Sequence, residues 1–170
     1  FRCRSAKNVA REFLDLNQRF GIRDFLITDD IFNVHLGHAK DVLREIIKLR
    51  ISPRIYFPNG LRGDIMDAEF LDLMQEAGTV EVVYAIEAGT DRIQKLIKKN
   101  LKMRRGEESI IETAKRNIVV NAFFMIGFPG ETSASLRGTS QAMGEVARAA
   151  QELQGDLEGC LSGLRQAADA

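Results

Sequence analysis

Three short segments of the chain place polar or glycine residues directly after a run of apolar residues. Residues 123–132 (FFMIGFPGET) end an apolar run in two glycines and a proline, which let the backbone approach a ligand closely. Residues 85–99 (AIEAGTDRIQKLIKK) place the carboxylate of Glu87 at the end of a second apolar run, and residues 26–32 (LITDDIF) place two aspartates after a third. These segments are the candidates for ligand binding.

Each segment also has a purely structural explanation. Residues 127–130 can form an ordinary turn. Thr90 is expected to cap a helix that carries Lys98 and Lys99, and charged residues are common on helix surfaces. Binding of a phosphate by the glycine-rich turn is the least favoured alternative, because no basic residue follows it immediately, as one does in a phosphate-cradling loop.

Two further residue pairs have side chains that can bind metals, but neither pair supplies enough ligands for a metal site. His35 and His38 are three positions apart and would share a helix face, but no third ligand accompanies them. Cys3 and Cys160 lie far apart in sequence, which favours neither a disulfide framework nor a metal knuckle. We therefore assign no metal ligand in this chain.

The elements that must position these residues alternate between strand and helix periodicity. Short apolar runs predict strands near residues 24–28, 54–57, 80–86 and 118–126, the second ending at a Pro-Asn-Gly turn. Helical spacing of apolar residues precedes or follows each run, near residues 5–20, 36–50, 67–77, 90–99 and 107–116. Ser5 is expected to cap the first of these helices and Gly21 to end it. This alternation predicts an α/β fold with about four parallel strands, adjacent in the sheet in the same order as in the sequence, whose carboxyl ends carry the function.

Composition excludes several classes of partner. The 24 basic and 24 acidic residues cancel, so no net field favours nucleic acid or an anionic surface. No apolar run is long enough for a membrane span, and the amino terminus lacks a signal-peptide core. With two distant cysteines, a reducing cytoplasmic location is expected. The absence of an initiator methionine predicts that the chain starts inside a longer protein or was processed.

The composition changes after Thr132. Phe, Lys and Pro do not occur again, and Ala, Gly, Gln and Leu dominate. Apolar residues between Met143 and Leu164 recur at alternating threes and fours, which predicts one or two helices. We therefore divide the chain into residues 1–132 and an Ala-rich helical tail, 133–170, of uncertain origin.

Taken in order, the motifs resemble the radical S-adenosylmethionine (SAM) superfamily, in particular its cobalamin-binding and methylthiotransferase-like branches. The resemblance covers roughly residues 1–132. It rests on Arg4-Ser5 at the first helix, the Asp29-Asp30 turn, the segment from Glu87 to Ile93 and the GFPGET strand end.

The resemblance implies a partial (β/α) barrel of which this chain holds about four strands, plus the helical tail. It also implies SAM and a [4Fe-4S] cluster as cofactors of the complete protein, and the cobalamin-binding branch adds cobalamin as a candidate. In the family, a CxxxCxxC motif binds the cluster. This chain has no such motif, and Cys3 stands where the family has a variable residue.

The resemblance further implies which residues contact SAM. Asp29 and Asp30 match polar positions near the methionine amino group, although turn formation explains them as well. Glu87 matches a strand end that contacts the ribose or the methionine. Lys99 matches a basic position, usually Arg, that pairs with the SAM carboxylate, and a solvated helix face is the alternative.

The GFPGE turn matches the adenine side of the family's SAM site. The residues are Gly127, Phe128, Pro129, Gly130 and Glu131. Glu131 is expected to brace the turn rather than touch the ligand. Asn59 either faces the ligand or forms an Asn-Gly turn.

The leading functional hypothesis is therefore that this chain is part of an enzyme that binds SAM. The complete protein would cleave SAM reductively to drive radical chemistry on a substrate that the sequence does not identify. The alternative is a truncated or fused non-catalytic remnant, an interaction module at most. The missing cysteine motif favours this alternative for the isolated chain.

Overall fold

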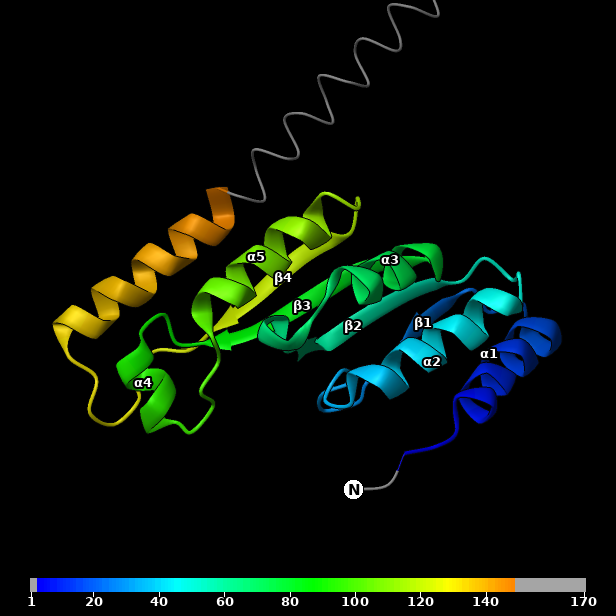
Figure 1. Ribbon diagram of the computed structural model, residues 1–170, viewed down its shortest axis with the longest axis horizontal. Coiled ribbons are helices and arrows are strands. Elements are labelled where there is room, and N and C mark those ends of the chain that lie inside the picture. The colour runs from blue at the N-terminus through cyan, green and yellow to red at the C-terminus, as the bar shows by residue number, and fades with distance from the viewer. Residues whose placement is uncertain (1–2, 149–170) are drawn as a thin grey trace, which may run out of the picture.

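The computed structural model describes residues 3–148. Strands and helices alternate along this part of the chain (Figure 1). The elements are α1 (Ala6–Phe20), β1 (Asp24–Leu26), α2 (Leu36–Lys48), β2 (Arg54–Leu61), the 3-10 helix η1 (Gly63–Ile65), α3 (Ala68–Glu76), β3 (Thr79–Glu87), α4 (Asp91–Leu96), α5 (Met103–Ala114), β4 (Val119–Phe124) and a helix over residues 133–148.

The four strands form one open sheet in the order β1-β2-β3-β4, and every neighbouring pair is parallel. The expected α/β class, strand number and spatial order are confirmed. Because parallel neighbours must be joined by crossovers, helices α2, α3 and α5 connect successive strands. Together with α1 they lie on one face of the sheet (Figure 1).

Local sequence signals explain where the helices begin and end. The Ser5 hydroxyl accepts a hydrogen bond from the Asn8 amide at the start of α1, and Gly21 ends that helix with a φ of 68°. Asp67 caps α3 in the same way, through a bond from the Phe70 amide. The expected helix near 107–116 begins earlier, at Met103.

The Pro-Asn-Gly sequence does not end β2, contrary to the expected turn. The strand continues to Leu61 with a register shift against β3 between Phe57 and Leu61. Gly60 has a φ of 93°, and a Cβ built on it would lie 2.8 Å from the Cβ of Ala85. The sequence therefore forms a bulge in which glycine allows β2 and β3 to approach closely.

The core lies between the helices and one face of the sheet. Phe57 and Tyr84 are buried there, and Phe13 of α1 stacks on Phe25 of β1 with the ring centroids 4.1 Å apart. On the opposite face Leu26 and Phe123 are 62% and 49% exposed. The sheet therefore buries one face, and the other face is open in the described part of the chain.

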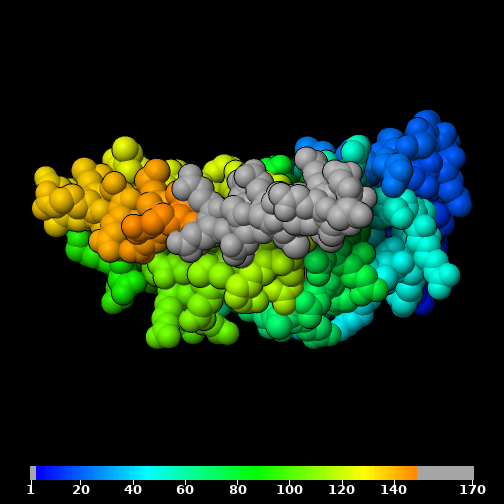
Figure 2. Space-filling model, turned by 90° about the horizontal axis from the view of Figure 1, so that it is seen from above, coloured from blue at the N-terminus to red at the C-terminus, as the bar shows by residue number. Residues whose placement is uncertain are grey.

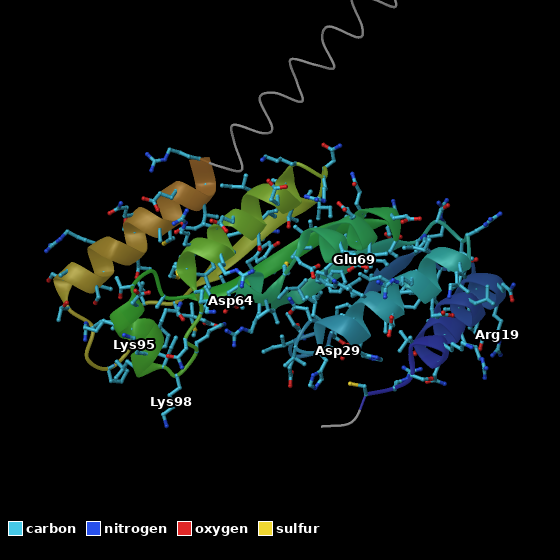
Figure 3. The ribbon with its side chains drawn as sticks, in the orientation of Figure 1. Arg19, Asp29, Asp64, Glu69, Lys95 and Lys98 are labelled. Atoms are coloured by element: carbon cyan, nitrogen blue, oxygen red, sulfur yellow. The ribbon has the colours of Figure 1, made fainter. Side chains whose placement is uncertain are left out.

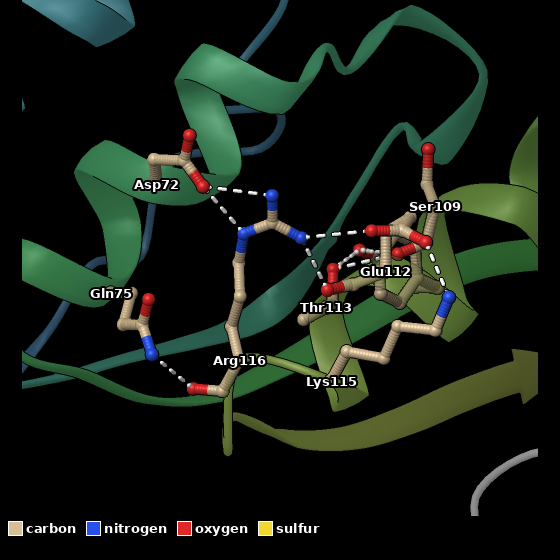
Figure 4. A network of polar contacts seen from close by, with 8 residues as sticks. Asp72, Gln75, Ser109, Glu112, Thr113, Lys115 and Arg116 are labelled. Atoms are coloured by element: carbon tan, nitrogen blue, oxygen red, sulfur yellow. Dashed lines mark hydrogen bonds and ion pairs between the residues drawn. The ribbon is translucent and has the colours of Figure 1, made fainter.

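Polar contacts fix α5 on α3 and on the sheet (Figure 4). The Arg116 guanidinium lies 2.7 Å from a carboxylate oxygen of Asp72, and Gln75 donates to the Arg116 carbonyl. Inside this layer the Tyr84 hydroxyl contacts Thr113 Oγ1 and the Ser109 carbonyl. Burial raises the pKa of Tyr84 well above its ordinary value.

The helix over residues 133–148 packs at the end of the molecule opposite α1 (Figure 2). The Gly89 amide donates to Thr139 Oγ1, and Thr139 and Ala142 are buried. A Cβ on Gly89 would lie 2.6 Å from the Cα of Thr139, so glycine is required for this contact. A helix expected in the tail is therefore present over residues 133–148. The rest of the tail, with Cys160, lies outside the described residues. The domain boundary near residue 132 stays a prediction.

We predict that Tyr84→Phe lowers the free energy of unfolding by about 1–2 kcal/mol at pH 7, because it removes a buried hydrogen-bonding hydroxyl. Urea denaturation will measure this loss. In the unfolded chain Tyr84 ionises near pH 10. Because its folded-state pKa is higher, wild type loses stability above that pH and the difference between the two proteins shrinks. Tyr56→Phe is the control, because its hydroxyl bonds Asp24 at an exposed position, and equal stabilities of wild type and Tyr84→Phe at pH 7 would contradict the assignment.

We predict that Gly89→Ala detaches the helix over residues 133–148, since the new methyl group collides with the backbone of that helix. Hydrogen exchange of amides 133–148 should become roughly tenfold faster or more, while α5 keeps its protection. Gly144→Ala is the matched control, because a Cβ there meets nothing within 4 Å. Unchanged exchange in the Gly89 variant would show that the packing is not as described.

Candidate functional site

The carboxyl ends of the four strands lie along one edge of the sheet. Asp29 and Asp30 follow β1, Glu87 ends β3, and Gly127 follows β4. Neighbouring strands are about 4.8 Å apart, and Glu87 pairs with Phe124 at the end of β4. Leu26 at the end of β1 is level with Tyr56 and Glu81, so Glu87 lies two strands across from β1 and six residues further along the sheet. The candidate residues thus line an edge long enough for an elongated ligand.

The loop after β1 is held by β2. Asn59 donates from Nδ2 to the Thr28 carbonyl at 2.7 Å and to the Asp29 carbonyl at 3.5 Å. The side chains of Asp29 and Asp30 are exposed at this edge. Asn59 therefore neither forms the expected Asn-Gly turn nor leaves its amide free, and it fixes the loop that carries the two aspartates.

Buried polar residues that the sequence analysis missed hold the loop after β2. The Asn33 side chain bonds both the amide and the carbonyl of Arg62, at 3.1 and 2.9 Å. Arg62 in turn donates two bonds to Asp64. Burial opposes the charge of Asp64, but the bonds from Arg62 outweigh it and hold the Asp64 pKa below its usual value. No sequence motif marks these residues.

Glu87 adopts a strained backbone conformation. Its φ is 70°, and the Ala88 amide bonds back to the Ile86 carbonyl at 2.9 Å. This closes a three-residue γ-turn around Glu87 in the rare form with positive φ. Such a conformation costs a non-glycine residue about 1–3 kcal/mol, and strained residues of this kind cluster at functional sites.

The Glu87 carboxylate forms an ion pair with Lys99, whose Nζ lies 2.8 Å from Oε1. The two side chains are 21% and 18% exposed, so the pair is largely enclosed but still accessible. The expected helix carrying Lys98 and Lys99 is wrong in extent, because α4 ends at Leu96. Lys98 points away from the sheet (Figure 3), whereas Lys99, past the helix end, turns back to Glu87.

Thr90 stands at the N-cap position of α4 but does not cap it. Its side chain makes no capping hydrogen bond, and its buried Oγ1 has no partner among the described residues. A Cβ built on Gly138 would lie 2.5 Å from the Thr90 Cγ2, so the Thr90 methyl group packs closely against Gly138. Packing against the helix over 133–148 therefore replaces the expected cap.

The turn after β4 is held in shape by Glu131. Its Oε2 accepts the amides of Gly127 and Phe128, which confirms the expected bracing role. Gly127 and Gly130 have φ values of 98° and 86°, which favour glycine at both positions. Arg92 of α4 donates to the Gly130 carbonyl at 2.8 Å and so ties the turn to the Glu87 segment.

Glu87 and this turn are also joined through the backbone. The Met125 amide donates to the Glu87 carbonyl at 2.7 Å. The structure thus brings Glu87, Lys99 and the Gly127–Glu131 turn into one connected unit. Asp29 and Asp30 lie at the same edge, with β2 between them and Glu87.

A hollow of about 430 Å³ lies between α1, α2 and β1. Cys3, Asp29, His35 and His38 are among the residues that line it. Within residues 3–148 no group of three or more His, Cys, Asp or Glu side chains could hold a metal ion. In the same residues no helix is long and apolar enough to cross a membrane.

Comparison with known proteins places this geometry in context. The Radical SAM superfamily matches residues 2–142. The cytidylyl-2-hydroxyethylphosphonate methyltransferase of Streptomyces wedmorensis is 36% identical over 129 residues, which cover 75% of this chain and 24% of that enzyme. The tRNA-2-methylthio-N(6)-dimethylallyladenosine synthase of Ruegeria sp. strain TM1040 is 26% identical over 84% of this chain and 34% of its own length.

Among solved structures, the radical SAM methyltransferase TsrM from Kitasatospora setae superposes with a TM-score of 0.76 at 25% identity, over 85% of this chain. One TsrM structure contains cobalamin and a [4Fe-4S] cluster, and another contains tryptophan and the SAM analogue aza-SAM. The chain spans about a quarter of TsrM and of the Streptomyces enzyme. With the family match covering most of its length, the chain belongs to the radical SAM superfamily.

Proposed function

We propose that this chain forms the SAM-binding edge of a radical SAM enzyme that performs radical or methyl-transfer chemistry. Members of the superfamily use SAM and a [4Fe-4S] cluster. The observation that carries the proposal is the accessible Glu87–Lys99 ion pair, built on a strained turn at the carboxyl edge of the sheet. Strain that the surrounding structure maintains is typical of a binding site.

The side chains at this edge suit the polar groups of SAM. Glu87 offers acceptors for a ribose hydroxyl or for the ammonium group, and Lys99 offers a cation for the carboxylate. Asp29 and Asp30 are alternative acceptors for the ammonium group, because the ammonium and carboxylate groups of SAM share one carbon and cannot reach the β1 loop and Lys99 at the same time. The turn from Gly127 to Glu131 presents backbone without bulky side chains at its glycines, which suits the flat adenine ring.

The residues of this chain do not fit the cluster. Three thiolates are needed to hold it, and the chain contains only Cys3 and Cys160. In the complete protein a bound cluster would supply the electron for reductive cleavage of SAM. We therefore assign cluster binding to residues of the complete protein that lie outside this chain.

The two-cysteine count also supports a second candidate, a non-catalytic remnant of the same fold. The two candidates differ in SAM binding, which only the first requires. The substrate of the complete enzyme follows from neither, because the related enzymes act on different substrates.

We predict that Glu87→Gln weakens SAM binding by this chain roughly tenfold or more, because it removes a charged acceptor and breaks the pair with Lys99. Lys99→Met should weaken binding by a similar factor. Titration calorimetry, or NMR titration with millimolar SAM, will measure both. Lys98→Met is the matched control, since Lys98 points away from the sheet. Wild-type affinity in the Glu87 and Lys99 variants would place SAM elsewhere.

We predict that the chain alone neither assembles a four-iron cluster nor cleaves SAM. Anaerobic reconstitution with iron and sulfide, followed by iron analysis and an assay for 5′-deoxyadenosine, checks this. The physical reason is the number of thiolates, since a lone cysteine cannot replace three. Four irons per chain together with product formation would overturn the assignment of the cluster ligands to another segment.

A further inference from the structure

The side chain of Gln94 is buried beneath the Glu87 turn. Gln94 is only 1% exposed, although it lies on a short helix near the surface. Its Nε2 donates to the Ile86 carbonyl at 2.6 Å and to the Ala88 carbonyl at 2.7 Å. These two carbonyls flank Glu87, so both protons of the amide are used on the turn that holds Glu87 at positive φ.

The same residue also fixes the segment that carries Lys99. The backbone carbonyl of Gln94 accepts the amides of Lys99 at 3.1 Å and Asn100 at 3.3 Å. Its side-chain Oε1 accepts the Leu101 amide at 3.4 Å. Gln94 therefore contacts the backbone on both sides of the Glu87–Lys99 ion pair but does not touch either charged group.

Only a side chain with two donors and an acceptor can make these bonds together. Methionine has a similar length but offers no donor, and it would leave the Ile86 and Ala88 carbonyls without this partner. Glutamate has the same shape, but its ionised form would place negative charge against two carbonyl oxygens. Burial and those carbonyls would favour the protonated form, which can donate a single bond.

We infer that Gln94 is the positioning residue of the site, which sets the geometry of Glu87 and Lys99 for their ligand. The inference rests on the proposed SAM-binding function and adds to it a residue that acts through the backbone. Gln94 makes no contact with the ligand. Its substitution changes affinity by rotating the Glu87 carboxylate away from Lys99.

The test compares wild type with Gln94→Met and Gln94→Glu in NMR titrations with SAM. Gln94→Met should weaken binding roughly tenfold, and the nuclear Overhauser contact between the Lys99 ε-methylene and the Glu87 γ-methylene should disappear. Gln94→Glu should bind weakly at pH 8 and recover part of its affinity near pH 6, relative to wild type at the same pH. Gln75→Met is the matched control, because Gln75 also donates to a backbone carbonyl, that of Arg116, but outside the site.

The outcomes separate this inference from the proposed function. If Glu87→Gln weakens binding but folded Gln94→Met binds SAM as wild type does, the positioning role is wrong and the SAM site stands. If Glu87→Gln leaves binding unchanged, the proposed function fails, and the Overhauser contact in the free protein still tests whether Gln94 sets the pair. Should Gln94→Met not fold, Gln94→Glu decides. Weak SAM binding by Gln94→Glu that is folded at pH 8, with recovery near pH 6, supports the positioning role, and wild-type affinity of the folded variant at pH 8 overturns it.

Discussion

The parallel pairing of the four strands is the constraint on which the rest of the structure depends. Because every strand runs in the same direction, every crossover must return over the sheet, and all carboxyl ends meet at one edge. The crossover helices therefore bury one face, and the loops that carry Asp29, Glu87 and Gly127 share the edge. No single loop could form the site, since its residues come from segments about a hundred positions apart.

Within that edge, rigidity comes from hydrogen bonds to the backbone more than from contacts among charged groups. Asn59 bonds carbonyls of the β1 loop, Asn33 bonds the β2 loop, Gln94 bonds the β3 turn, and Glu131 bonds amides of the β4 turn. Each strand end thus has one polar side chain that satisfies its loop. This leaves Asp29, Asp30 and the Glu87–Lys99 pair available for a ligand.

The sequence was sufficient to predict the strands, their order and the helix caps at Ser5 and Gly21, because apolar periodicity and capping are local properties. It was insufficient where distant contacts decide the conformation. Pro58-Asn59-Gly60 looks like a turn, but Gly60 lies against Ala85 of the neighbouring strand and the segment becomes a bulge. No sequence motif marks the role of Gln94, because its side chain bonds backbone groups, which every residue type other than proline supplies in full.

The positive φ of Glu87 places stability and binding in opposition at one position. Glycine would occupy that conformation without a steric penalty, so a library selected only for thermal resistance should accept the substitution Glu87→Gly readily. A library selected for ligand binding should retain the acid. Sequence drift at this position would therefore indicate which pressure a lineage has experienced, and a lineage that no longer binds its ligand should lose the acid early.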